Sequence, residues 1–200
     1  MTTYKDMKEF HEAASNGYLD KVKELINKGI DADIEDLDGG TALFKAVKGG
    51  HKEVIKFLID SGADVNFSNR EWGHTPIFTA VASGNGEIIK LLICNGAYVN
   101  AKRKDGFTPL HIAAAKGYDK IVKILIENGA KVRIKNNDYE TPIDLAEFFK
   151  RRSSVDNSSH HKIVEMLKEA IWIEKRRKNK MHTNQLILYT TKLARKVFRR

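Results

Sequence analysis

The chain has 200 residues, of which 42% are hydrophobic and 30% are charged. This length allows one ordinary core or a short stack of repeats, and the composition fits a soluble, ordered chain rather than a disordered one. The single cysteine, Cys94, excludes an internal disulfide framework and favours a reducing compartment.

The net charge of +9 is confined to the C-terminal segment. Residues 171–200 contain ten Lys or Arg and one acidic residue, Glu174, whereas acids and bases balance over the first 170 residues. Any polyanionic partner therefore concerns this segment alone. The first residues lack the apolar run of a signal peptide, and no window of 18 residues is apolar and uncharged. We expect the cytoplasm, or the nucleus or a host-cell cytosol if the basic segment is an address.

Three markers recur at intervals of 33 or 34 residues, which indicates a repeat architecture. The first marker is a glycine that follows a pair of small residues: Gly17, Gly50, Gly84 and Gly117. The second is a glycine near the end of each repeat: Gly29, Gly62, Gly96 and Gly129. The third is a threonine: Thr41, Thr75, Thr108 and Thr141.

Each period predicts a helix, a short turn, a second helix and a loop that contains glycine. In the fourth period, Thr108 is a suitable N-cap and Pro109 fits the first helical position, so we expect a helix over 109–115. An apolar stripe at helical spacing predicts the second helix over 119–127. Gly129 can end that helix in the left-handed conformation.

The best copy of the repeat, at 106–114, reads Gly-Phe-Thr-Pro-Leu-His-Ile-Ala-Ala. This motif and the segments that follow it resemble an ankyrin-repeat protein, over roughly residues 5–170. The resemblance implies an all-α solenoid of about five helix-turn-helix units, in which His111 returns a hydrogen bond to Thr108. It also implies that partners dock on a concave surface made of turn tips and first helices.

We place the units at about 5–35, 36–68, 70–102, 103–135 and 136–170. The first and last units are caps, because a terminal repeat must expose a polar outer face. The expected organisation is thus a repeat domain over 1–170 and a basic helical extension over 171–200.

Positions at which the sequence differs from the repeat motif lead to further predictions. Phe44 and Phe78 replace the motif histidine, so they should pack well but lose its hydrogen bond. One extra residue within 68–71 should make that loop bulge. The fifth unit has Tyr139 where the turn glycine belongs, and about nine extra polar residues over 151–159.

The basic extension is predicted to be an amphipathic helix, and three interpretations of it stay open. It binds nucleic acid or anionic lipid through Lys175, Arg176, Arg177, Lys178, Lys192, Arg195 and Lys196. It is a nuclear import address, centred on 175–180. It is an extra helix that packs Trp172, Leu186 and Leu193 on the last unit.

No set of residues has the spacing of a catalytic, cofactor-binding or metal site, so we expect no enzyme, no cofactor and no metal. The adjacent His160 and His161 are interpreted as solvated histidines at a helix start. Cys94 is interpreted as a free, unreactive thiol, and His111 as a structural residue of the motif.

The expected function is therefore to bind another protein, whose identity is unknown, and the chain is expected to act as a monomer. Partner contacts should come from motif positions that the fold leaves free: Leu37, Asp38, Lys45, Glu71, Trp72, His74, Lys104, Asp105, Phe107, Ile112 and Lys116. The same register adds Gly40, Lys48, Thr79, Ala82, Ser83, Ala115, Asn137, Asp138 and Glu140. Trp72 and Phe107 are the strongest candidates, since a turn tip does not need an aromatic residue and interface hot spots favour aromatic ones.

Overall fold

The structure of the protein is a computed structural model. It describes residues 3–152 and 158–197, and from residue 178 onward only the backbone. The described residues form ten α-helices and no β-strand, which confirms the all-α prediction.

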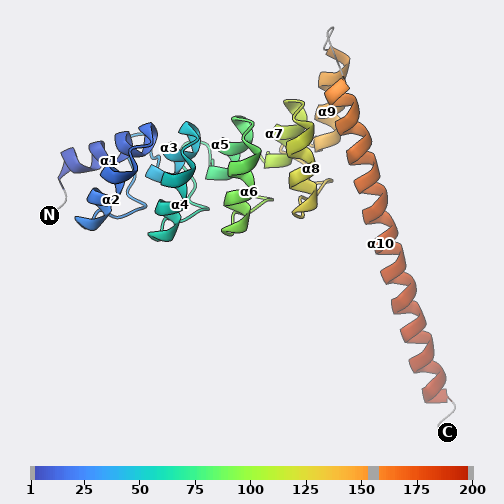
Figure 1. Cartoon of the computed structure of the whole chain (residues 1–200). Helices are drawn as coiled ribbons and strands as arrows, with labels where there is room; N and C mark the ends of the chain where they lie inside the picture. Colours follow the sequence, from blue (N-terminus) through green and yellow to red (C-terminus); the bar gives the residue numbers. More distant parts are fainter. Residues whose placement is uncertain (1–2, 153–157, 198–200) are drawn as a thin grey trace.

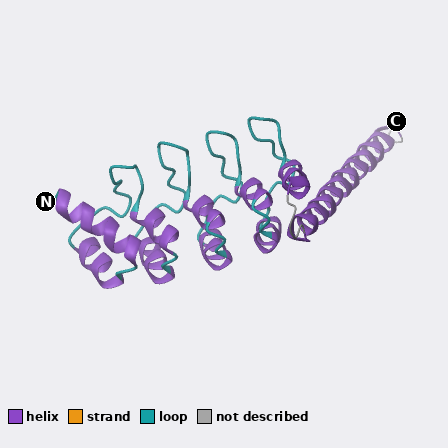
Figure 2. Ribbon diagram, turned by 90° about the horizontal axis from the view of Figure 1, so that it is seen from above, coloured by secondary structure: helices purple, strands orange, loops and turns teal. Residues whose placement is uncertain are grey.

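The helices come in pairs that stand side by side in one row, from α1 to α9 in chain order (Figure 1). Figure 2 shows four loops that project from one side of this row, each between two successive pairs. We call them the hairpin loops; their tips lie at 36–40, 69–74, 103–107 and 136–140. The pairs are α1 (Tyr4–Asn16) with α2 (Leu19–Asn27), α3 (Ala42–Gly49) with α4 (Lys52–Asp60), α5 (Pro76–Ala82) with α6 (Gly86–Cys94), α7 (Pro109–Ala115) with α8 (Asp119–Glu127), and α9 (Pro142–Arg152) with α10 (Ser158–Val197).

The start of α7 has the hydrogen bonds that the motif predicts. Thr108 is an extended N-cap (φ −110°, ψ 165°) and Pro109 occupies the first turn. The hydroxyl and the backbone N–H of Thr108 both donate to Nδ1 of His111, at 2.8 and 3.1 Å. With Nδ1 as acceptor, Nε2 carries the ring proton and donates to the carbonyl of Glu140 at 3.1 Å. The ring therefore caps α7 and also ties this pair to the next one.

A single column of leucines runs through the core. All of its members are fully buried on the second helix of a pair: Leu25, Leu58, Leu92, Leu125 and Leu167. Burying one such side chain contributes about 2 kcal/mol, so the column is a main source of cohesion between neighbouring pairs. The last leucine follows its predecessor by 42 residues instead of 33, which confirms about nine extra residues in the fifth unit.

In every pair after the first, a residue at or just before the start of the second helix packs on the glycine that follows the first helix of the preceding pair. A Cβ atom on Gly17 would meet the ring of His51 at 2.5 Å, and one on Gly117 would meet His160 at 2.9 Å. Nε2 of His160 donates to the carbonyl of Ala115 at 3.1 Å. The interpretation of His160 as solvated is therefore wrong, because the nine-residue insertion returns the chain to register at this histidine. His161 is exposed, as expected.

Phenylalanine at the histidine position leaves a threonine without a partner. Phe78 is only 2% exposed, so its ring packs well, but the buried hydroxyl of Thr75 has no hydrogen-bond partner among the described residues. The expected loss of the hydrogen bond is confirmed there. In α3 the equivalent Thr41 is compensated differently, because its hydroxyl accepts the backbone N–H of Phe44 at 3.3 Å.

Two hairpin loops depart from the common geometry as predicted. The second is closed by the N–H of Asn69 on the carbonyl of His74, so it holds one residue more than the loop closed between Asp36 and Gly40. The extra residue bulges the tip. In the fourth loop, Tyr139 occupies the left-handed region with φ +63° where the other tips have glycine, and its side chain is 77% exposed.

α10 continues far beyond the row of pairs (Figure 1). The second helices of the other pairs end before a glycine of positive φ, whereas the equivalent position in α10 is Ile171. Without that glycine nothing stops the helix, so the expected boundary at 170/171 falls inside it. Within the described residues, no helix, α10 included, is both long and apolar enough to cross a membrane.

The proposed packing of Trp172 on the last unit is wrong. Its side chain is 54% exposed, and the guanidinium of Arg176 lies over its ring at 4.4 Å from the centroid. Ile171, one residue earlier, is half-buried against the core. At this position of α10, the side chain of Trp172 therefore points away from the repeats. Leu186 and Leu193 lie outside the residues whose side chains the structure describes.

Candidate protein-binding surface

The hairpin loops and the first helices form one face of the row, which Figure 2 views from above. The hollows on this face of the described residues include an N-terminal pocket and a central groove. The N-terminal pocket, of about 380 Å³, is formed by α1, residues 35–38 and Lys45. The central groove, of about 360 Å³, crosses α3, α5 and α7. Each is large enough to hold one or two side chains of a partner.

The N-terminal pocket holds three of the predicted contact residues, Leu37, Asp38 and Lys45. Leu37 is 87% exposed at the mouth of this pocket, so its apolar side chain is accessible to a partner. Nζ of Lys45 lies 2.7 Å from Asp36 and 4.0 Å from Asp38. Burial opposes the ionisation of Asp36, but Lys45 and the N–H of Gly40 outweigh it and hold its pKa below the usual value.

The α1 wall of this pocket was not anticipated from the sequence. α1 begins about five residues before the register of the other first helices, and Tyr4 and Met7 on this extra length line the pocket. A capping box explains the early start, because the Thr3 hydroxyl accepts the N–H of Asp6 while the Asp6 carboxylate accepts the N–H of Thr3. The spacing of Thr3 and Asp6 is visible in the sequence and would have indicated this helix start.

Trp72 and Glu71 lie at the bulged second hairpin loop. The backbone of Trp72 is fixed, because its carbonyl accepts the N–H of Lys104 at 3.1 Å, while its side chain is 55% exposed. Glu71 lines a hollow between the first two tips, beside the ion pair of Arg70 with Glu35 at 2.8 Å. The bulge thus presents an aromatic side chain on an anchored backbone.

The central groove has an aromatic floor. Phe44 and Phe78 line it from α3 and α5, and Ile112 lines it from α7. The imidazole of His74 stacks on Phe78 with the ring centroids 5.8 Å apart. Burial, followed by the charge of Arg103, lowers the pKa of His74, so its ring is neutral near pH 7.

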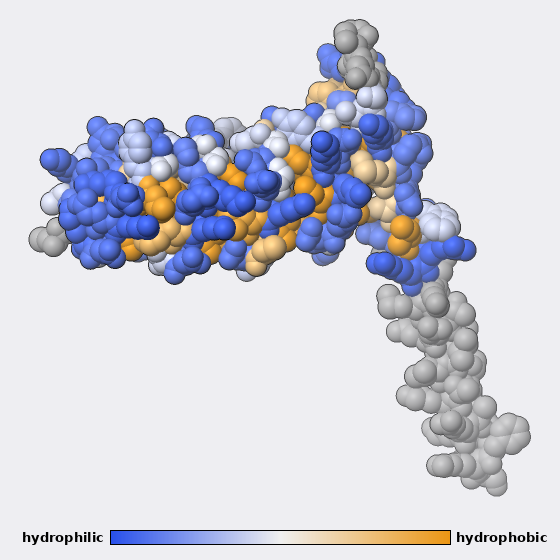
Figure 3. All heavy atoms as spheres, viewed as in Figure 1, coloured by the Kyte–Doolittle hydropathy of each residue, from blue (hydrophilic) through white to orange (hydrophobic). Residues whose placement is uncertain are grey.

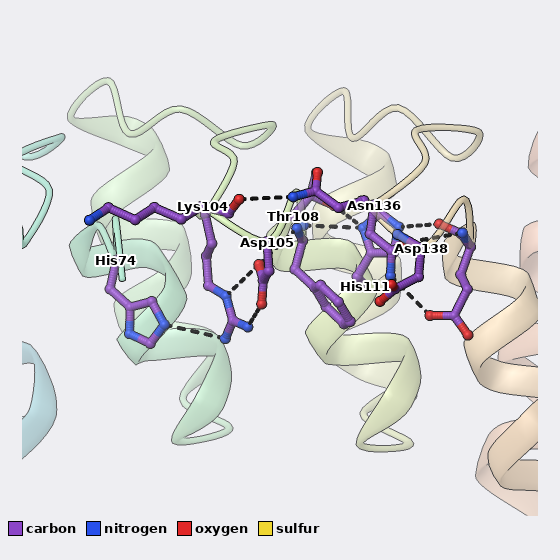
Figure 4. A network of polar contacts seen from close by, with 11 residues as sticks. His74, Lys104, Asp105, Thr108, His111, Asn136 and Asp138 are labelled. Atoms are coloured by element: carbon purple, nitrogen blue, oxygen red, sulfur yellow. Dashed lines mark hydrogen bonds and ion pairs between the residues drawn. The ribbon is translucent and has the colours of Figure 1, made fainter. Parts of the chain in front are cut away.

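Arg103 holds several of the predicted residues in place at the rim of the groove. Two of them, His74 and Asp105, are labelled in Figure 4. Its guanidinium pairs with Asp105, donates to Nε2 of His74 at 3.3 Å, and lies 5.2 Å from the ring centroid of Phe107. The hydrogen bond from Arg103 holds the pKa of Asp105 below its usual value. Arg103 was not singled out from the sequence, and its place at the base of the third tip was the only signal.

Phe107 is half-buried rather than free at a turn tip. Its ring packs on His111 at 5.5 Å between centroids and under the guanidinium of Arg103. The position therefore has a structural use within the chain, and its part in binding stays a prediction. Lys104 is similarly occupied, because its ammonium reaches the carbonyl of Arg70 in the neighbouring loop.

The structure divides the predicted contacts into two groups. His74, Ile112 and Lys116 meet at the central groove, whereas Leu37, Asp38 and Lys45 belong to the N-terminal pocket. In Figure 3, hydrophobic residues form an interrupted band along the row of pairs, between hydrophilic ones.

The basic extension presents three of its predicted contact residues on the exposed stretch of α10: Lys175, Arg176 and Arg177. Lys178, Lys192, Arg195 and Lys196 lie outside the residues whose side chains the structure describes. Among the residues with described side chains, no group of His, Cys, Asp and Glu has the arrangement of a metal site.

The family follows from a comparison with known proteins. Residues 10–103, 68–136 and 99–179 each match the family model described as ankyrin repeats (3 copies). The chain belongs to the ankyrin-repeat family. The members of this family generally act through contacts with other proteins, and the repeat is typically non-catalytic.

The ankyrin-repeat chain is similar to segments of larger proteins. It is 44% identical over 63 residues to serine/threonine-protein kinase 12 of Arabidopsis thaliana, which covers 32% of this chain and 14% of that one. It is 36% identical over 64 residues to an ankyrin repeat-containing protein of Schizosaccharomyces pombe, covering 32% and 30%. It is 38% identical over 60 residues to protein phosphatase 1 regulatory subunit 12A of Mus musculus, covering 30% and 6%. The matched parts thus span less than a third of each of these relatives.

Proposed function

We propose that this ankyrin-repeat protein is a non-catalytic interaction module that binds a partner protein on the face formed by the hairpin loops and first helices. The observation that carries the proposal is the juxtaposition on this face of two hollows with the exposed side chains of Leu37 and Trp72. Large exposed apolar side chains on a fixed backbone favour binding, because ordering them costs little entropy.

The test begins with capture of a partner and measurement of its Kd for the full chain. Trp72→Ala and Leu37→Ala should each weaken binding by about 2 kcal/mol, or roughly 30-fold, if they are anchors. Tyr98→Ala is the matched control, because Tyr98 is also an exposed aromatic residue, at 67%, but lies in the loop after the second helix α6 and lines neither the N-terminal pocket nor the central groove. Equal effects of all three substitutions would contradict the proposal.

A second candidate function is the binding of nucleic acid or an anionic membrane through the basic extension. It is favoured by the three adjacent, exposed cations Lys175, Arg176 and Arg177 on a helix that leaves the body. Replacing all three by Gln should reduce binding to DNA, RNA or anionic vesicles and flatten its salt dependence. Unchanged binding across a salt series would reject this function.

A further inference from the structure

The central groove has an apolar floor and a cationic rim. The floor arises from departures from the repeat motif, since Phe44 and Phe78 stand where the motif has histidine. His74 lies on Phe78 and adds a neutral aromatic surface. The groove therefore favours an apolar side chain, and this preference belongs to this chain rather than to the repeat in general.

The charged residues that line the groove are all basic. Lys48 lines it from α3, Arg103 from the third hairpin loop and Lys116 from the position directly after α7, and no acidic residue lines it. Asp105 neutralises part of the charge of Arg103. Nζ of Lys116 donates to the uncharged carbonyl of Ala82 at 3.1 Å and lies 5.7 Å from the ring centroid of Tyr118. Within the described residues, neither Lys116 nor Lys48 forms an ion pair with an acidic residue. Two ammonium groups thus remain available on opposite sides of α5.

The N-terminal pocket has the opposite balance. Four carboxylates line it, from Glu12, Glu35, Asp36 and Asp38, against the ammonium groups of Lys8 and Lys45. The balance of charged side chains therefore changes sign along one face of the molecule, from negative at the N-terminal pocket to positive at the central groove. An acidic segment is attracted to the groove and repelled from the pocket.

We infer that the central groove takes an acidic peptide segment of the partner, in which one large apolar side chain is flanked on both sides by carboxylates. The apolar side chain enters the groove over Phe44, Phe78 and Ile112, and the flanking carboxylates meet Lys48 and Lys116. The volume of about 360 Å³ suits one large side chain with part of its neighbours. This inference rests on the proposed function and states the chemistry of the partner at one place on the binding face.

The test screens a random ten-residue peptide library against the full chain, and the enriched peptides then serve as probes for titration. We expect Asp or Glu on both sides of a Phe, Leu, Ile, Met or Trp. Lys48→Glu with Lys116→Glu should weaken these probes at least tenfold. Lys56→Glu with Lys90→Glu is the matched control, because both lysines are exposed on second helices and the charge change is the same. The control pair should stay within twofold, and circular dichroism should show that both variants fold.

Several results would overturn the inference. The first is that the library yields no enriched peptides, or enriched peptides without acidic residues. The second is that both double variants lose affinity for the peptides equally. The third is that the chain binds a ten-nucleotide single strand more tightly than the peptides. If the probes lose affinity with Trp72→Ala or Leu37→Ala but not with the groove variant, the proposed function stands and the inference about the central groove fails. If none of these variants affects the probes, both fail.

Discussion

The unpaired hydroxyl of Thr75 allows a substitution that stabilises the protein at one repeat and destabilises it at the next. Thr75→Val keeps the shape of the side chain and replaces a buried oxygen that has no partner among the described residues. Thr75 caps α5 with its backbone only, so no side-chain hydrogen bond is lost. Since a buried unsatisfied polar group costs about 1–3 kcal/mol, the variant should gain about 1 kcal/mol.

Thr108→Val makes the same chemical change where the hydroxyl is used. It removes the bond to Nδ1 of His111 at 2.8 Å, whose net value is about 0.5–1.5 kcal/mol. The two variants should therefore differ by about 2 kcal/mol in free energy of unfolding, with opposite signs relative to the parent. Urea denaturation followed by circular dichroism measures both, with the m-value as a check that the same transition is compared. A loss of stability in Thr75→Val as large as that in Thr108→Val would refute the reasoning.

The remaining predictions concern backbone strain and buried histidines. Tyr139→Gly should raise the free energy of unfolding by about 0.5–1 kcal/mol, because glycine tolerates φ +63°; a thermal melt with no upward shift would contradict this. Gly106→Ala should cost more than Gly29→Ala in urea denaturation, since the new Cβ would lie 2.5 Å from Asn137 at the first site and meets nothing within 4 Å at the second. Burial lowers the pKa of His74 and His111 from the usual 6.5, so the native state binds fewer protons than the unfolded state and stability should fall as the pH drops from about 7 to 5; a flat profile would count against buried neutral rings.

Much of the fold was predictable because the repeat places residues with one conformational use at fixed positions. Gly106, Gly117 and Gly129 all have positive φ, which only glycine adopts without cost. The Thr108 and His111 pair could be read as a cap for the same reason. The course of α10 was also readable, because Ile171 stands where a glycine would end the helix.

The functional surface was less predictable because it depends on side chains from different repeats. Register placed His74, Ile112 and Lys116 on one face, but only the packing of three first helices shows that they share a groove. Register also suggested a free Phe107, yet Arg103 and His111 enclose its ring. Such contacts depend on the shapes of neighbouring side chains, which spacing alone does not contain.

The most direct test of the central claim is hydrogen–deuterium exchange of the full chain, alone and with a captured partner. The partner should protect the hairpin loops and the first helices α3, α5 and α7 from exchange. Protection confined to the second helices α4, α6 and α8, or to residues 171–177, would contradict this claim.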